Sequence, residues 1–70
     1  MMPLTFASVG ETATIRKITG KDEIRQHLAE LGFVVGETVT VVSSIGGNLI
    51  LNIKGSRIAL DASMAQRVML

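Results

Sequence analysis

The only histidine in the 70-residue chain, His27, lies four residues after Glu23 and three residues before Glu30. On an α-helix this spacing places the three side chains on one flank, where an imidazole and two carboxylates could bind a divalent metal ion. The alternative is a solvated flank with mild Glu–His pairing, which is favoured because no second layer of polar groups accompanies the three residues. We therefore predict no metal centre and no cofactor, and keep Glu23, His27 and Glu30 as the candidate ligands for weak divalent metal binding.

The sequence also lacks the combinations of side chains that catalysis requires. A serine becomes a nucleophile only when a base is held beside it. His27 is the only histidine that could serve as this base, and no glycine-framed serine elbow is present. Asp22 and Glu23 are adjacent, so on a helix their carboxylates do not face each other. The chain has no cysteine either, so we predict a protein that binds a partner and is not an enzyme.

Apolar residues make up 47% of the chain, but only two of them, Phe6 and Phe33, are aromatic. A domain this small buries only about 60% of the surface of its unfolded chain, so some apolar side chains should be exposed, where they often mark a partner surface. The candidates for partner binding fall outside the predicted core rows and are Val34, Val35, Ile45, Ile50, Met64 and Met69. The alternative is that Phe33 and one valine plug an end of the fold while the other candidates fill gaps.

Charge and hydropathy exclude some partners. The formal net charge is only +1, so we predict no nucleic-acid partner, and the loose cluster of Arg16, Lys17, Lys21 and Arg25 is interpreted as a solvated face. No apolar run approaches the roughly 20 residues that span a bilayer. The N-terminus lacks the basic start of a signal peptide. We therefore expect a cytoplasmic protein without direct membrane insertion, and self-association stays open.

The elements that must position these groups are mostly short strands in one domain, residues 1–70. Alternating apolar residues and turn signals predict five strands, at residues 12–18, 38–44, 48–53, 56–60 and 67–70. Gly46-Gly47 and Lys54-Gly55 are predicted to form tight turns between the middle three strands. Five short strands can remove their exposed edges by closing into a small barrel.

One helix is expected over residues 21–31, because Ile24, Leu28 and Leu31 form a single apolar stripe. Asp22 is predicted to cap its start and Gly32 its end. This helix would cover one open end of the barrel. Shorter helical turns are predicted at residues 4–8, capped by Thr5, and at residues 62–65, capped by Asp61.

Two stretches carry a family pattern. They are LAELGFVVG at residues 28–36, which leads into TVTV, and GGNL at residues 46–49, which is followed by GSRIAL at residues 55–60. In order and spacing they resemble the FeoA proteins, and the resemblance covers nearly the whole chain. It implies an SH3-like barrel that acts as a small cytoplasmic partner of FeoB, a membrane transporter for ferrous iron with a GTPase domain. The expected role is therefore accessory or regulatory, through protein–protein contact.

Two positions depart from that family pattern. A proline is common just before the second glycine of the first stretch, where this chain has Val35. The valine should make the loop less rigid and add apolar surface. After the IAL sequence the family usually has a basic residue, where this chain has Asp61. A basic contact at this point is therefore in doubt.

A second family pattern leads to a different function. The stretch from Ile24-Arg25 to Gly36-Glu37-Thr38-Val39 resembles DNA-binding regulators of the AbrB type, which are dimers with swapped hairpins. The Ile-Pro expected before the helix is missing, and the chain is only weakly basic. An AbrB-like transcription regulator is therefore the alternative to a FeoA-like accessory protein.

Overall fold

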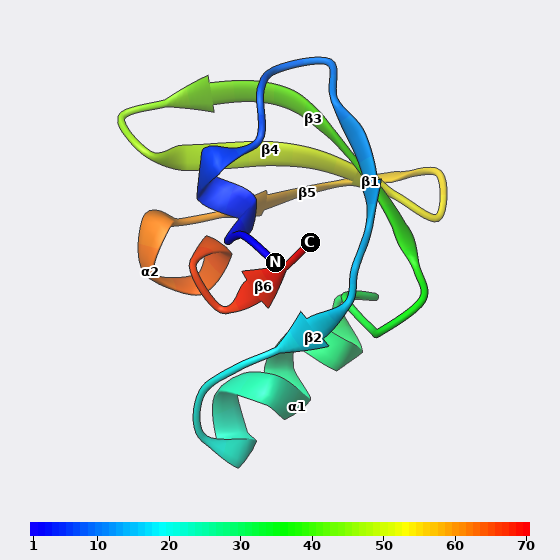
Figure 1. Cartoon of the computed structure of the whole chain (residues 1–70), viewed down its shortest axis with the longest axis vertical. Helices are drawn as coiled ribbons and strands as arrows, with labels where there is room; N and C mark the ends of the chain where they lie inside the picture. Colours follow the sequence, from blue (N-terminus) through cyan, green and yellow to red (C-terminus); the bar gives the residue numbers. More distant parts are fainter.

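The computed structural model describes all 70 residues, and its largest element is an antiparallel sheet of four strands (Figure 1). The strands are β1 (Thr12–Thr14), β3 (Thr38–Ile45), β4 (Asn48–Ile53) and β5 (Ser56–Leu60), in the spatial order β1-β3-β4-β5. Leu49, Leu51 and Ile53 of β4 are buried and the residues between them are exposed. The alternation predicted from the sequence is therefore confirmed, and it directs one face of the sheet into the core.

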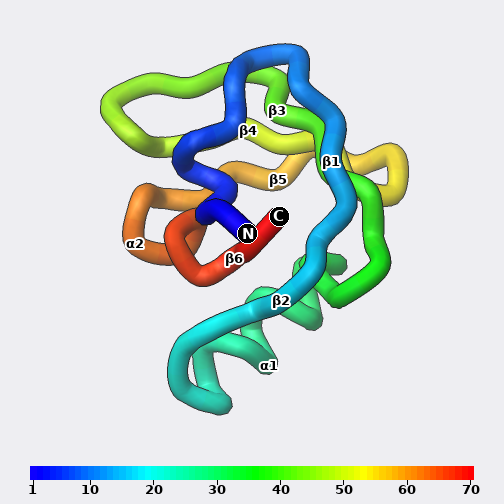
Figure 2. The backbone as a smooth tube through the Cα atoms, in the orientation of Figure 1, coloured from blue at the N-terminus to red at the C-terminus, as the bar shows by residue number.

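A short antiparallel ribbon of β2 (Lys17–Ile18) and β6 (Val68–Met69) lies in front of the sheet in the view of Figure 1. The two ends of the chain join this ribbon. The Met2 amide donates to the Leu70 carbonyl (3.2 Å), and the Leu70 amide donates to the Met2 carbonyl (2.8 Å). Figure 2 shows both termini side by side near the centre of the molecule. The termini thus help to close the barrel over its core.

Three helical segments complete the chain: the 3-10 turn η1 (Leu4–Phe6), α1 (Asp22–Glu30) and the one-turn α2 (Ala62–Ala65). Helix α1 covers one end of the barrel, below β2 in Figure 1. Leu28 is fully buried, and Ile24 and Leu31 are partly buried against the core. The predicted apolar stripe is therefore confirmed. None of these helical segments combines the length and the apolar character that a membrane-spanning helix requires.

The core consists only of apolar side chains. No buried side-chain nitrogen or oxygen lacks a hydrogen-bond partner. Every layer of the fold contributes to the core: η1, the segment between β1 and β2, α1, the four-stranded sheet, α2 and the C-terminal strand. Its thirteen residues are Leu4, Ile15, Leu28, Phe33, Val39, Val41, Leu49, Leu51, Ile53, Leu60, Ala65, Val68 and Leu70.

The single strand predicted over residues 12–18 is wrong, because the chain changes partner in the middle of it. Ala13 of β1 pairs with Val39, whereas Ile18 of β2 pairs with Val68 in the other sheet. Between them Ile15 turns inward and is 1% exposed. The fold accordingly has six strands where five were expected, and the last strand is shorter than residues 67–70.

Two predicted caps are also wrong. Thr5 lies inside η1, which begins after Pro3 and has no side-chain cap. Lys21 is the N-cap of α1, again without a side-chain hydrogen bond, and Asp22 is the first helical residue. There its carboxylate can still stabilise the positive end of the helix. The end of α1 is as predicted, since Gly32 has φ +106°, a conformation that glycine adopts without strain.

Candidate protein-binding cleft

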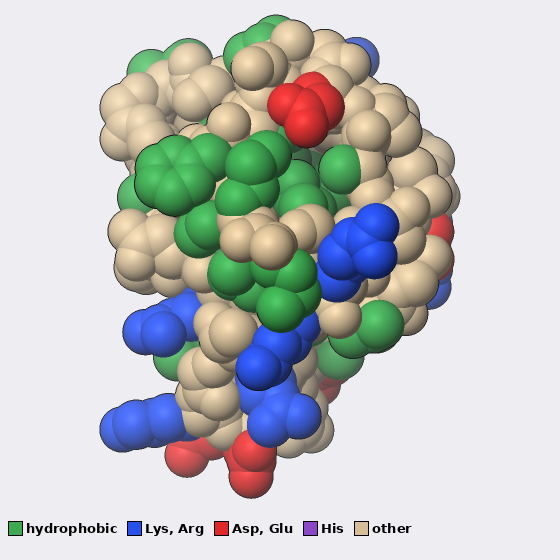
Figure 3. Space-filling view, in the orientation of Figure 1, with side chains coloured by type: hydrophobic (Ala, Val, Ile, Leu, Met, Phe, Trp, Pro, Cys, Tyr) green, Lys and Arg blue, Asp and Glu red, His purple; other side chains and the backbone are tan.

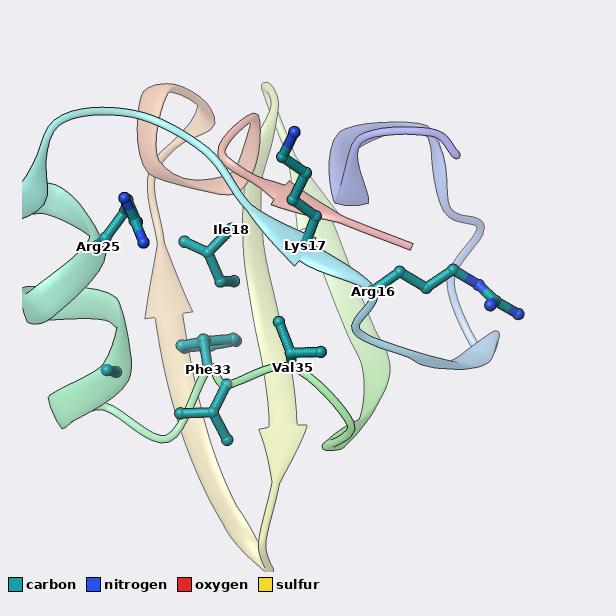
Figure 4. A pocket seen from close by; sticks show the side chains of 8 residues that line it. Arg16, Lys17, Ile18, Arg25, Phe33 and Val35 are labelled. Carbon is teal, nitrogen blue, oxygen red and sulfur yellow. The ribbon is translucent and has the colours of Figure 1, made fainter.

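A cleft of about 430 Å³ lies between α1, β2 and the loop that follows α1. Five apolar residues line it: Ile18, Ala29, Phe33, Val34 and Val35. Figure 4 shows the side chains of Ile18, Phe33 and Val35 gathered around this hollow, with Arg25 on the α1 side. The cleft is therefore an apolar depression assembled from three separate segments.

The floor of the cleft is part of the core. Phe33 is fully buried, as is Leu28 in the last turns of α1. The Phe33 amide donates to the Leu28 carbonyl (2.9 Å), which fixes the aromatic residue directly after the helix. Phe33 is therefore a core residue, as the alternative interpretation of the apolar residues expected, and the core supports the exposed wall above it.

The wall is formed by Val34 and Val35, which are 36% and 64% exposed. Backbone hydrogen bonds on both sides hold this loop in place. The Gly36 amide donates to the Ile15 carbonyl (2.8 Å), and the Ile15 amide donates to the Glu37 carbonyl (2.9 Å). The two valines are thus kept at the surface by their neighbours' backbone, and Val35 adds the apolar surface expected from its replacement of proline.

The remaining lining residues are the cations Arg16, Lys17 and Arg25. Arg16 and Lys17 are exposed and have no ion-pair partner, while Arg25 contacts Asp22 at 3.4 Å across an exposed i,i+3 pair. No carboxylate lines the cleft. Figure 3 shows Lys and Arg side chains next to apolar side chains on the face that carries β2 and the two chain ends. The cluster interpreted from the sequence as a solvated face therefore includes the rim of an apolar cleft.

A second, smaller hollow of about 280 Å³ lies at the tip of the β3–β4 hairpin. Ile45, which is 75% exposed, and Ile50, which is 38% exposed, line it together with Asn48, Leu49 and Ala59. No charged residue borders this hollow. Gly46 and Gly47 form the predicted turn, with φ +59° and +85°.

The six partner-binding candidates therefore do not form one surface. Val34 and Val35 line the cleft, and Ile45 and Ile50 line the hairpin hollow. Met64 packs against the core and Met69 is only partly exposed. Phe6 was not among the candidates, yet it is 73% exposed, because η1 turns Leu4 toward the core and leaves Phe6 outside. No signal in the local sequence distinguishes these two orientations.

The candidate metal ligands Glu23, His27 and Glu30 are exposed on α1. The structure contains no group of three or more His, Cys, Asp or Glu side chains arranged to hold a metal ion. Metal binding by these residues stays a prediction to which the geometry adds no support.

Asp61 has a structural role that accounts for one departure from the family pattern. Its Oδ1 accepts a hydrogen bond from the Met64 amide (2.9 Å) and another from the Ser63 hydroxyl (3.0 Å), so it caps α2 as predicted. The bond from the Met64 amide, and next the bond from Ser63, lower the pKa of this carboxyl below its usual 3.8. A basic side chain cannot accept either hydrogen bond.

Comparison with known proteins identifies the family. The model of the FeoA domain matches residues 2–70. The chain belongs to the FeoA domain family. It is also similar to the Putative Fe(2+) transport protein A of Methanocaldococcus jannaschii, with 33% identity over 99% of this chain and 84% of the relative. The resemblance found in the sequence is therefore confirmed.

Solved structures of FeoA proteins share the fold. A crystal structure of an iron uptake regulatory protein, FeoA, has 32% identity and a TM-score of 0.90 over 97% of this chain and 90% of that one. Zinc-complexed FeoA of Stenotrophomonas maltophilia, described as a prokaryotic SH3 domain protein, has 33% identity and a TM-score of 0.84 over 99% and 88% of the two chains. The predicted SH3-like barrel is confirmed.

The same barrel occurs within larger proteins. A manganese-dependent transcriptional repressor superposes with a TM-score of 0.87 at 19% identity, over 94% of this chain and 38% of the repressor, which shows a shared fold alone.

The AbrB-type pattern covers residues 24–39, which in this structure belong to α1, the loop that follows it and β3 of the four-stranded sheet. The AbrB-type interpretation of these residues as a swapped hairpin is therefore wrong.

Proposed function

We propose that this FeoA-family chain is a non-catalytic accessory protein of ferrous iron uptake. It would act in the cytoplasm, through contact with the FeoB-type transporter or its GTPase domain. The observation that supports the proposal most strongly is the FeoA match over residues 2–70, together with a relative named for Fe(2+) transport. The Stenotrophomonas protein is described as a candidate activating factor of ferrous iron transport, which fits the same role.

The surface of the molecule is consistent with a role in protein–protein contact. Its cleft offers exposed valines and free cations, which are groups that bind another molecule. None of the lining residues is a carboxylate, histidine or serine that could act as an acid, a base or a nucleophile. The cleft would therefore bind a segment of the partner.

Co-purification tests the proposal directly. The tagged chain is expressed with the cytoplasmic domain of the FeoB transporter from the same organism, and uptake of ferrous iron is measured in cells with and without the chain. We expect the two proteins to co-purify and uptake to change when the chain is deleted. Absence of association, together with unchanged uptake in the deletion strain, would overturn the proposal.

A further inference from the structure

The cleft combines two properties that restrict what can occupy it. Its floor and wall are apolar, formed by Phe33, Val34, Val35 and Ile18, and its rim carries only positive charge. An apolar surface alone would accept many partners. The positively charged rim of Arg16, Lys17 and Arg25 restricts the range of partners, because a ligand with complementary charge associates faster and more selectively.

The nearby carboxylates do not neutralise this rim. Asp22 is in contact with Arg25 but is 98% exposed, so the pair is open to solvent and weak. Glu37 pairs with Lys54 at 3.7 Å and is not one of the residues that line the cleft. Arg16 and Lys17 therefore remain free to pair with carboxylates from outside the chain.

The cleft is also formed before any partner arrives. Reciprocal backbone hydrogen bonds join the valine loop to Ile15, and Phe33 below it is fully buried. A preformed site loses little conformational entropy on binding, so a short segment can bind it. Long side chains at the rim can reach over such a segment while their charged ends stay in water.

We propose that the cleft binds an acidic-apolar peptide segment of the partner, in which Asp or Glu residues flank apolar side chains. The apolar side chains would pack on Val35 and Ile18, above the buried Phe33. The carboxylates would pair with Lys17 and Arg16. This inference rests on the proposed function for the identity of the protein that carries the segment. The second hollow, at the hairpin tip, has no cations and takes no part in this contact.

The inference is tested with synthetic peptides that together cover the cytoplasmic segments of the transporter. They are titrated into the isotope-labelled chain while the backbone amide NMR signals are recorded. We expect acidic-apolar peptides to shift the signals of Ile18, Val34 and Val35, and increasing NaCl to weaken the binding because exposed charges are screened. Equal binding of peptides in which Gln and Asn replace Glu and Asp would overturn the charge requirement.

A matched pair of variants tests the same point from the other side. Lys17→Glu and Arg57→Glu both reverse one exposed cation without an ion-pair partner, but only Lys17 lines the cleft. We expect Lys17→Glu to weaken peptide binding by about two- to tenfold, as for a solvent-exposed ion pair that becomes repulsive. Arg57→Glu should bind as the unmodified chain does. Equal effects of the two variants would overturn the proposal.

The remaining outcomes separate the inference from the proposed function. If the intact transporter domain co-purifies but no peptide shifts the cleft signals, the inference fails and the proposed function stands. If peptides bind while the intact domain does not, and uptake is unchanged in the deletion strain, the inference holds and the proposed function fails. If vesicles of phosphatidylglycerol shift the cleft signals and peptides do not, the cleft binds an anionic lipid surface and the peptide proposal is overturned.

Discussion

The cleft beside α1 and the hollow at the β3–β4 hairpin both expose apolar side chains, but only the cleft is surrounded by cations. Val35 is 64% exposed in the first region, and Ile45 is 75% exposed in the second. Exposure alone would thus rank the hairpin first as a partner surface. The two regions differ in what surrounds the exposed residue. Val35 lies above the buried Phe33, in a loop that backbone hydrogen bonds join to Ile15.

The two regions also differ in how polar groups stabilise them. At the hairpin, Asn48 Oδ1 accepts a hydrogen bond from the Ala62 amide (3.2 Å), and Asp61 caps the same short helix. At the cleft, backbone bonds hold the valine loop, and Arg25, paired with Asp22, is the only lining cation that contacts a carboxylate. The hairpin end therefore uses its polar side chains for folding, whereas the cleft end keeps Arg16 and Lys17 available for a ligand.

The largest expected effect comes from removing the support of the cleft. Leu28→Ala should lower the free energy of unfolding by about 2–5 kcal/mol, from the lost transfer energy and the cavity left in the core. A domain of this size has a reserve of only about 3–5 kcal/mol, so much of the protein should unfold. Thermal unfolding followed by circular dichroism measures the loss. Ile45→Ala, at the exposed hairpin tip, is the control and should change stability by less than about 0.5 kcal/mol.

A smaller effect is expected from two glycines, one in each region. Gly36, with φ +95°, and Gly47, with φ +85°, both adopt a conformation that strains an L-residue. Each change to alanine should cost about 1–3 kcal/mol for this reason. A Cβ at Gly47 would also lie 3.3 Å from the Ala62 Cβ, whereas nothing lies within 4 Å at Gly36. Urea denaturation should therefore show the greater loss for Gly47→Ala, and the reverse order would contradict the packing described at the hairpin.

Replacing Val35 with the proline that is common in the family should have a still smaller effect. The Val35 amide donates no hydrogen bond in the structure, so a proline there removes none. Val35→Pro should leave the stability unchanged or raise it by up to about 1 kcal/mol, because it restricts the unfolded chain. Calorimetric unfolding is the measurement. A marked loss of stability would show that the backbone at this position cannot accept the ring.

The smallest effect concerns the cap at the hairpin end and depends on pH. The folded state lowers the pKa of Asp61 below 3.8, so its carboxylate stabilises the fold at higher pH. That contribution should be lost as the pH falls through the lowered pKa. Asp61→Asn keeps a cap but cannot titrate. The stability difference between the two chains should shrink between neutral pH and the acid range below 3.8, and a constant difference would contradict the assigned role.

Local patterns predicted most of the sheet correctly. Strict alternation at Leu49, Leu51 and Ile53 allows only one face to be buried, and the Gly46-Gly47 turn sets the hairpin. The division of residues 12–18 into two strands could not be predicted, because it depends on long-range pairing with Val39 and Val68. Local spacing determines an element, but the partner of each half of a segment is decided by the whole fold.

The candidate site was predicted only in part for the same reason. Val34 and Val35 were identified as surplus apolar surface after the helix. Their relation to Arg16 and Lys17 depends on the hydrogen bonds that join residues 15 and 36 in the folded chain. The structure shows that the cations and the valines, which are far apart in the sequence, line the same cleft. Ile45 and Ile50 lie in a different region, at the hairpin hollow.

The cleft, and not the hairpin hollow, is the surface that we expect to contact the partner. The most direct measurement compares Val35→Ser and Ile45→Ser by titration calorimetry against the purified cytoplasmic domain of the transporter. Each variant removes one exposed branched apolar side chain, so the two are matched. We expect Val35→Ser to weaken binding about tenfold, from the lost apolar contact, and Ile45→Ser to leave the affinity unchanged. Weaker binding by Ile45→Ser with unchanged binding by Val35→Ser would contradict this account.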